Sequence, residues 1–193
     1  MTTNDNALAR TRAWVDRAVI GLNLCPFAKA PQAKGLVRYA LSEARDTEAL
    51  LANLVEELER LAESSPEQIE TTLLVHPWVL QDFLDFNDFL DVADAAVAHL
   101  GLDGILQVAP FHPQFQFADS APGDPGNATN QAPFPTLHLL REESIDRAVQ
   151  AFPDAGAIFQ ANIATLQQLG ADGWAQLLRQ CEQDADPPAP PPA

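Results

Sequence analysis

The apolar residues at the start of the chain recur at helical spacing. In segment 7–22 they are Leu8, Val15, Val19 and Leu22, with charged residues at other positions between them. This periodicity is typical of an amphipathic helix, so we predict a helix over 7–22. The residue before a proline avoids the helical region, and Pro26 therefore ends the helix. Cys25 is expected just after the helix C-terminus.

Apolar patterns of two kinds then alternate along the chain. Short β-rich runs predict strands over 36–41, 69–75 and 105–109, and apolar stripes predict helices over 48–63 and 80–100. Thr47 is expected to cap the first of these helices. Strands joined by helices of this length are the signature of βαβ units. We therefore expect an α/β (or α+β) fold: a single domain with a three- to four-stranded, mainly parallel sheet and flanking helices.

The last third of the chain is less regular. The alternation in segment 136–141, TLHLLR, allows a strand, and its leucine content allows a helix. We favour a fourth strand at the sheet edge, because Glu143 and Ser144 can cap a helix over 145–152. Two short helices are expected at about 159–169 and 173–182. The domain is then 1–182, and the proline-rich segment 183–193 is expected to be a disordered tail.

A long connection separates the predicted strands 105–109 and 136–141. Connections of this length inside a compact domain are uncommon, and those that are ordered are usually functional. Aromatic residues throughout the connection argue against disorder. We expect it to fold over the C-terminal edge of the sheet and to meet Cys25 and His76 there.

Composition limits the partners of the protein. The chain has 193 residues, with 27 Asp and Glu against 11 Lys and Arg, for a net charge of -16. This field repels phosphate backbones and anionic lipids, so neither nucleic acid nor membrane is expected as a partner, while a small-molecule ligand remains open. The start of the chain has no apolar run of signal-peptide length, and its two cysteines lie far apart. We expect a cytoplasmic protein of open oligomeric state.

His112 is the leading candidate for a general acid or base. It follows a predicted central strand, and ligands of open α/β sheets gather beyond the C-terminal ends of the strands. Pro113 holds His112 in extended geometry. His76 also precedes a proline at a strand end, so both imidazoles would share one edge if the two strands are parallel neighbours. The alternative is a histidine satisfied by backbone carbonyls beneath the loop.

Cys25 is the candidate nucleophile. A helix C-terminus disfavours the thiolate, so this role requires His112 or Arg141 to approach the thiol. The candidate substrate-binding residues are His138, Arg141, Asn127, Asn130 and His76. Surface pairing for Arg141 and turn formation for the asparagines are the simpler alternatives.

Three hypotheses of function follow. The first is an enzyme that acts on a small polar or anionic metabolite through His112 and Cys25. The second is a non-catalytic protein that binds a metal or a ligand through Cys25, His112 and His138. The third is an acidic protein-interaction module. The chain has no CxxC, HExxH or HxH spacing and no nucleotide-binding loop, so we assign no metal, and both the cofactor and the existence of an enzymatic activity stay open.

Three motifs resemble a family of bacterial proteins known as domain of unknown function 1415. They are GLNLCPF at 21–27, FHP at 111–113 and PTLHLLRE at 135–142, and the likeness extends over roughly residues 7 to 152. The resemblance implies a soluble single-domain protein and assigns no reaction, cofactor or catalytic residue. It also implies a basic and a small residue where this chain has Gln131 and Ala132.

Overall fold

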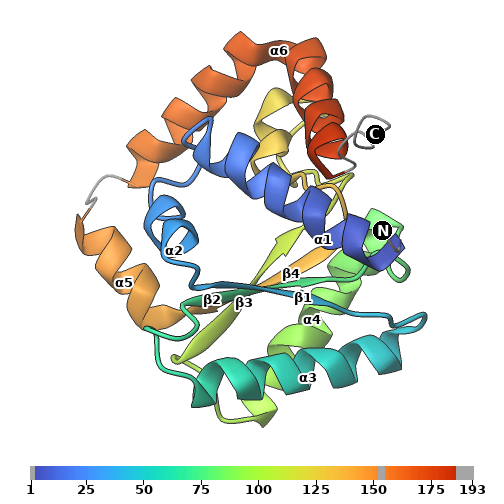
Figure 1. Ribbon diagram of the computed structural model, residues 1–193, viewed down its shortest axis with the longest axis vertical. Coiled ribbons are helices and arrows are strands. Elements are labelled where there is room, and N and C mark those ends of the chain that lie inside the picture. Colours follow the sequence, from blue (N-terminus) through green and yellow to red (C-terminus); the bar gives the residue numbers. More distant parts are fainter. Residues whose placement is uncertain (1–2, 152–154, 186–193) are drawn as a thin grey trace, which may run out of the picture.

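The computed structural model describes residues 3–151 and 155–185. One sheet of four strands divides this part of the protein into two layers (Figure 1). Helices α3 and α4 cover one face of the sheet, and helices α1 and α6 lie on the other. Most of the predicted tail and the last residue of the predicted helix 145–152 lie outside the described residues.

The strands are β1 (Val37–Leu41), β2 (Thr71–Val75), β3 (Leu106–Phe111) and β4 (Thr136–Arg141). Their order in the sheet is β1-β2-β4-β3. β1 and β2 are parallel, and β4 is antiparallel to both β2 and β3. β1, β2 and β3 therefore point the same way, and their C-terminal ends share one edge of the sheet with the start of β4.

The segment 136–141 is a strand, as predicted, but two expectations about the sheet were wrong. The sheet is mixed instead of mainly parallel, and β4 lies between β2 and β3 instead of at the edge. The crossover helices do make β1, β2 and β3 run in one direction, yet β4 inserts between the last two. β3 is consequently an edge strand and not a central one. Pro110, which has no N–H to donate, is tolerated there because edge strands leave one side of their backbone unpaired.

The main core lies between the sheet and the helices α3 (Thr47–Glu63) and α4 (Phe83–His99). The predicted cap of α3 was wrong, because the Asp46 carboxylate accepts the Ala49 N–H and Thr47 is already helical. α4 begins later than predicted because Asp82 caps it and Leu80 has a φ of 57°. Gly101, with a φ of 69°, ends α4 as predicted.

The second layer begins with α1 (Thr3–Trp14), which continues as the π-helical segment η1 (Val15–Ile20). The short helix α2 (Lys29–Ala33) and helices α5 (Glu142–Ala151) and α6 (Ala155–Ala185) follow, and α6 is kinked at Gly170. Residues 183–185 of the predicted tail therefore belong to a helix. Trp14, Tyr39, Leu73 and Leu177 pack into the core of this layer. No helix in the described part of the chain is long and apolar enough to cross a bilayer.

Candidate functional site

The long connection between β3 and β4 is folded around Asn127. It contains the short 3-10 helix η2 (Pro125–Asn130), in which Asn127 is buried. The Asn127 Oδ1 accepts the Phe117 N–H at 3.1 Å and the Ser120 hydroxyl at 2.7 Å, and its amide donates to the Ala121 carbonyl at 3.2 Å. All three side-chain contacts of Asn127 thus hold together two halves of its own loop.

Asn130 ties the same loop to the edge of the sheet. The side-chain amide of Asn130 donates to the Pro110 carbonyl at 3.1 Å, and the backbone carbonyl of Asn130 accepts the backbone N–H of His112. At the end of the loop, the Pro135 carbonyl accepts the backbone N–H of His76 at 3.0 Å. The connection therefore packs against the C-terminal edge of the sheet, beside both histidines.

Cys25 lies in a turn that contacts this loop through its neighbour. Leu24 packs against Ala128 of η2. Burial raises the pKa of the half-buried Cys25 thiol, and the backbone N–H groups of Phe27 and Ala28 offset part of that increase. The thiol forms no hydrogen bond with any histidine in the described part of the chain. A protonated thiol in a turn is a poor nucleophile.

His112 is fully buried on the α4 side of the sheet, and both of its nitrogens are bonded. Nε2 donates to the Leu80 carbonyl at 3.2 Å, and Nδ1 accepts the Gln114 N–H at 3.0 Å. Burial lowers the pKa of His112, so the ring is neutral. A neutral imidazole with both positions filled has no site left for a substrate proton.

His76 is buried at the same edge as His112, although β4 separates β2 from β3, so the two strands are not the parallel neighbours that the prediction assumed. The rings of His76 and His112 lie 5.8 and 5.0 Å from the ring of Phe86 on α4. His76 Nδ1 donates to the Val79 carbonyl at 3.1 Å, and burial lowers the His76 pKa to about 4. Its Nε2 is buried, and no residue in the described part of the chain bonds to it.

Together the two histidines hold the loop 77–82, which leads into α4. Each donates one N–H to a consecutive carbonyl of this loop, that of Val79 or that of Leu80. Leu80 lies in the left-handed region, where a bulky residue is strained and needs support from its surroundings. The two imidazoles at this edge therefore have a structural role, because they hold the backbone of the loop in place.

His138 lies on the opposite face of the sheet. Its Nε2 donates to the Thr71 hydroxyl at 2.8 Å, which in turn donates to the Leu139 carbonyl at 2.6 Å. These bonds fix the proton on Nε2 and leave Nδ1 as an acceptor that no described residue fills. Burial lowers the His138 pKa to about 4, so the ring is neutral at pH 7.

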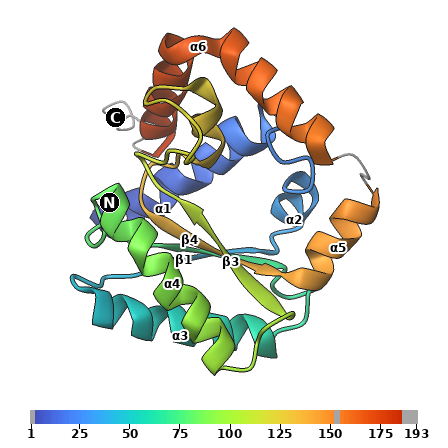
Figure 2. The same ribbon diagram turned by 180° about the vertical axis from the view of Figure 1, so that it is seen from behind.

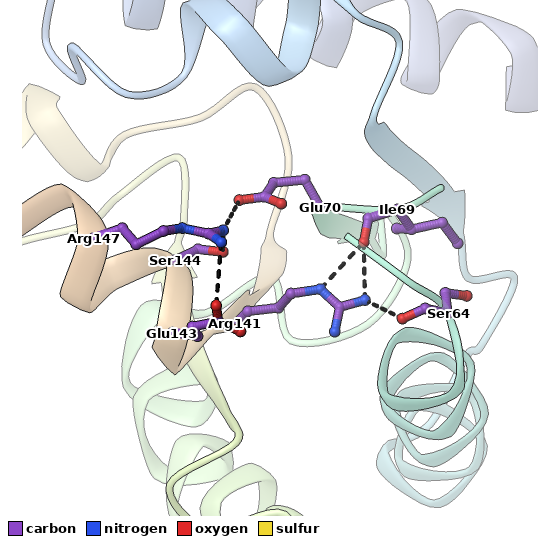
Figure 3. A network of polar contacts seen from close by, with 7 residues as sticks. All are labelled: Ser64, Ile69, Glu70, Arg141, Glu143, Ser144 and Arg147. Atoms are coloured by element: carbon purple, nitrogen blue, oxygen red, sulfur yellow. Dashed lines mark hydrogen bonds and ion pairs between the residues drawn. The ribbon is translucent and has the colours of Figure 1, made fainter. Parts of the chain in front are cut away.

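Arg141 caps a helix. Its guanidinium donates to the Ser64 and Ile69 carbonyls (Figure 3) and to the Leu61 carbonyl at the end of α3, with distances of 2.7 Å to both Ser64 and Leu61. The residue is buried. These bonds satisfy carbonyls that a helix C-terminus leaves open.

The structure does not bring the predicted site residues together. Alternation along β4 directs Arg141 to the α3–α4 side and His138 to the α1 side. Arg141 is also five residues, about 17 Å, along the strand from Thr136 at the edge that holds His112. Within residues 3–151 and 155–185, no group of three or more His, Cys, Asp or Glu residues is placed to hold a metal ion.

Two further polar residues on the α1 side were missed in the sequence. The Arg10 Nε and Trp14 Nε1 atoms are buried without a hydrogen-bond partner among the described residues, and they stand one helical turn apart on α1. The ring of Trp14 lies 5.1 Å from that of Phe111, which lies 5.7 Å from His138. The Arg10 guanidinium lies over the Phe134 ring. Their spacing of four residues indicates that they share one face of the helix, but the sequence does not reveal which side chains on that face lack hydrogen-bond partners.

One comparison with known proteins gives a match. A family model described as "Protein of unknown function (DUF1415)" matches residues 6–176. No curated protein and no solved structure matches the chain.

Proposed function

The chain belongs to the DUF1415 family, whose function is unknown, and we propose that it binds a small polar or anionic metabolite on the α1 side of the sheet, where His138 accepts a proton. The observation that carries this proposal is the open Nδ1 of His138. The hydrogen bond to Thr71 fixes the tautomer and the ring orientation. Such orientation by a second residue is typical of histidines that transfer protons.

Unpaired donors on α1 support an anionic ligand. A buried N–H without an acceptor is unfavourable by about 1 to 3 kcal/mol, so such groups in native proteins call for a partner such as a ligand or an ordered water. Trp14 Nε1 and Arg10 Nε are two such donors among the described residues, and the Phe111 ring contacts the rings of both Trp14 and His138. The donors would bind oxygen atoms of the metabolite, and His138 would accept its proton.

The π-helical segment η1 directly follows Trp14. Short π-helical insertions occur frequently at functional sites. Here the insertion begins one residue after an unpaired indole, which adds support for a site at this end of α1.

This proposal assigns other roles to the remaining candidates. Cys25, Asn127 and Asn130 form the loops behind the site, and His76 and His112 hold the entrance to α4. Enzymatic turnover then requires only proton transfer at His138 and no covalent step at Cys25.

A charged ligand would change the titration of His138. An anion near the ring stabilises the imidazolium, so binding should raise the His138 pKa from its depressed value of about 4. NMR titration of the ring in the presence of inorganic phosphate, acetate or succinate measures this change directly. Thermal unfolding with the same three anions gives an independent measure, with an expected increase of about 2 °C or more on binding.

The variant His138→Gln separates binding from folding. The glutamine amide can still donate to Thr71, but it has no basic nitrogen at the Nδ1 position. We expect this variant to fold and to lose most of the anion response, whereas His99→Gln, on the exposed end of α4, should respond like the wild type. An equal response of His138→Gln and the wild type, or no response of the wild type to any of the three anions, would contradict the proposal.

A further inference from the structure

Helices α3 and α4 lie side by side on the face of the sheet away from the proposed His138 site (Figure 2). A groove of about 370 Å³ runs between them on the outer surface. Its apolar lining comes from Leu51 of α3 and from Phe89 and Val92 of α4. Val92 is 41% exposed, which is high for a valine, and no described residue covers the groove.

Acidic residues form the rim of this groove. Glu48 lies on the α3 side, and Asp85 and Asp88 lie on the α4 side. None of these three carboxylates forms an ion pair with a residue in the described part of the chain. The rim therefore keeps its charge available for a partner.

The charge of the protein is concentrated in this layer. Segment 42–104, which contains α3 and α4, has fifteen Asp and Glu residues and only two Arg, so it carries -13 of the net charge of -16. On the outer surface of α4 the exposed acids are Asp82, Asp85, Asp88, Asp91 and Asp94. A field of this sign attracts cationic partners and repels anionic ones.

We propose that the α3–α4 groove binds a basic amphipathic helix of a partner protein. Apolar side chains of that helix, spaced at i, i+3, i+4 and i+7, would occupy the groove over Leu51 and Val92, and Lys or Arg beside them would meet Asp85 and Asp88. The charge excludes other occupants. A second copy of this chain would bring the same acidic rim against this one, and nucleic acid or an anionic bilayer would be repelled.

A helical peptide library tests the proposal with the full chain. The library is displayed on phage as 18-residue peptides that carry Leu at i, i+3, i+4 and i+7 and sample Lys, Glu, Gln and Ala elsewhere. Selection on the immobilised protein is expected to enrich Lys over Glu beside the leucines. The best peptide is then synthesised, and its affinity is measured by fluorescence anisotropy.

Matched double variants distinguish the groove from general attraction. Asp85→Asn with Asp88→Asn removes two rim charges, and Asp91→Asn with Asp94→Asn removes the same charge from the same helix away from the groove. We expect the first pair to weaken peptide binding about tenfold and the second less than about threefold. Among apolar positions, Val92→Ser should weaken binding, while Leu84→Ser, at a residue 71% exposed outside the groove, should not. All of these positions are exposed, so the variants should fold.

Three results would overturn the proposal. They are enrichment of neutral or acidic peptides, a selection that enriches no peptide, and equal weakening by the two double variants. A dimer in sedimentation velocity that Val92→Ser dissociates would also overturn it, because a second copy of the chain would then fill the groove.

Discussion

On the α3–α4 side of the sheet, His112 and Arg141 use their polar atoms to bind backbone groups of their own fold. On the α1 side, His138 keeps an open nitrogen, and Trp14 and Arg10 keep unpaired donors. The difference shows that residue type alone does not identify a site. Both nitrogens of His112 have partners, whereas His76 on the same side leaves its Nε2 without a partner in the described part of the chain, so each nitrogen has to be considered separately.

The two sides also differ in charge. Arginines of α1 pair with acids near the end of α6, as in Arg10 with Glu182 and Arg17 with Asp184. The aspartates of α4 form no ion pair within the described residues. The two sides therefore differ in how their surface charge is paired: within the described residues the acids of α4 have no ion-pair partner, whereas Arg10 and Arg17 of the α1 layer are paired with acids of α6.

The largest expected effect is the loss of the cap on α3. Arg141→Ala removes the donor to the carbonyls of Leu61, Ser64 and Ile69 and leaves them without their partner. We expect the free energy of unfolding to fall by about 4 kcal/mol, because each hydrogen bond to a charged group contributes about 1.5 to 3 kcal/mol. Urea denaturation measures this change.

A neighbouring arginine is the control. Arg147 is half exposed and pairs with Glu70 and Glu143 at the surface (Figure 3). Arg147→Ala should lower the free energy of unfolding by less than about 1 kcal/mol. If the free energy of unfolding falls by similar amounts in the two variants, Arg141 is not a structural residue.

The second largest expected effect is a dependence of the free energy of unfolding on pH, which arises from His76. Its pKa in the folded protein is about 4, whereas an unfolded histidine titrates near pH 6.5. Between these values the unfolded chain binds more protons, so stability is fully present above about pH 6.5 and is lost as the pH falls toward 4. A difference of this size corresponds to about 3 kcal/mol for one histidine.

Urea denaturation at pH 7, 5.5 and 4.5 tests this dependence. His76→Phe removes the titrating group while keeping an aromatic ring next to Phe86. The variant should lose stability less steeply than the wild type as the pH falls. An identical pH profile for the two proteins would mean that His76 does not titrate in this range.

The sequence predicted those parts of the fold that depend on residues close together in the chain. The apolar periods located α3, α4 and the first three strands, and Gly101 located the end of α4. The insertion of β4 was not predictable in the same way, because the pairing of Leu139 with both Thr72 and Val108 depends on contacts far apart in the chain. Segment 136–141 carries no local signal that separates a central strand from an edge strand.

The candidate site was predicted less well than the fold. His76 and His112 share one edge of the sheet, although their strands are not the parallel neighbours that the prediction assumed, and the long connection does fold over that edge. Their partners could not be predicted, because the carbonyls of Val79 and Leu80 turn toward the rings only through the left-handed backbone at Leu80. The sequence ranked His112 above His138, although both nitrogens of His112 have partners and the Nδ1 of His138 has none within the described residues.

The smallest expected effect on stability is also the sharpest test of the comparison between the two sides. Trp14→Phe removes an indole N–H that has no partner, and the gain from removing that unpaired group offsets part of the packing lost with the smaller ring. We expect the free energy of unfolding to change by less than about 1 kcal/mol, whereas His112→Phe, which removes two bonded nitrogens, should lower it by about 2 kcal/mol or more. The same Trp14→Phe protein should lose much of the thermal response to phosphate, acetate and succinate, because the N–H is assigned to the ligand and not to the fold. A large loss of stability with an unchanged anion response would show that the indole N–H supports the fold, and Trp14 would then be a structural residue of the α1 side.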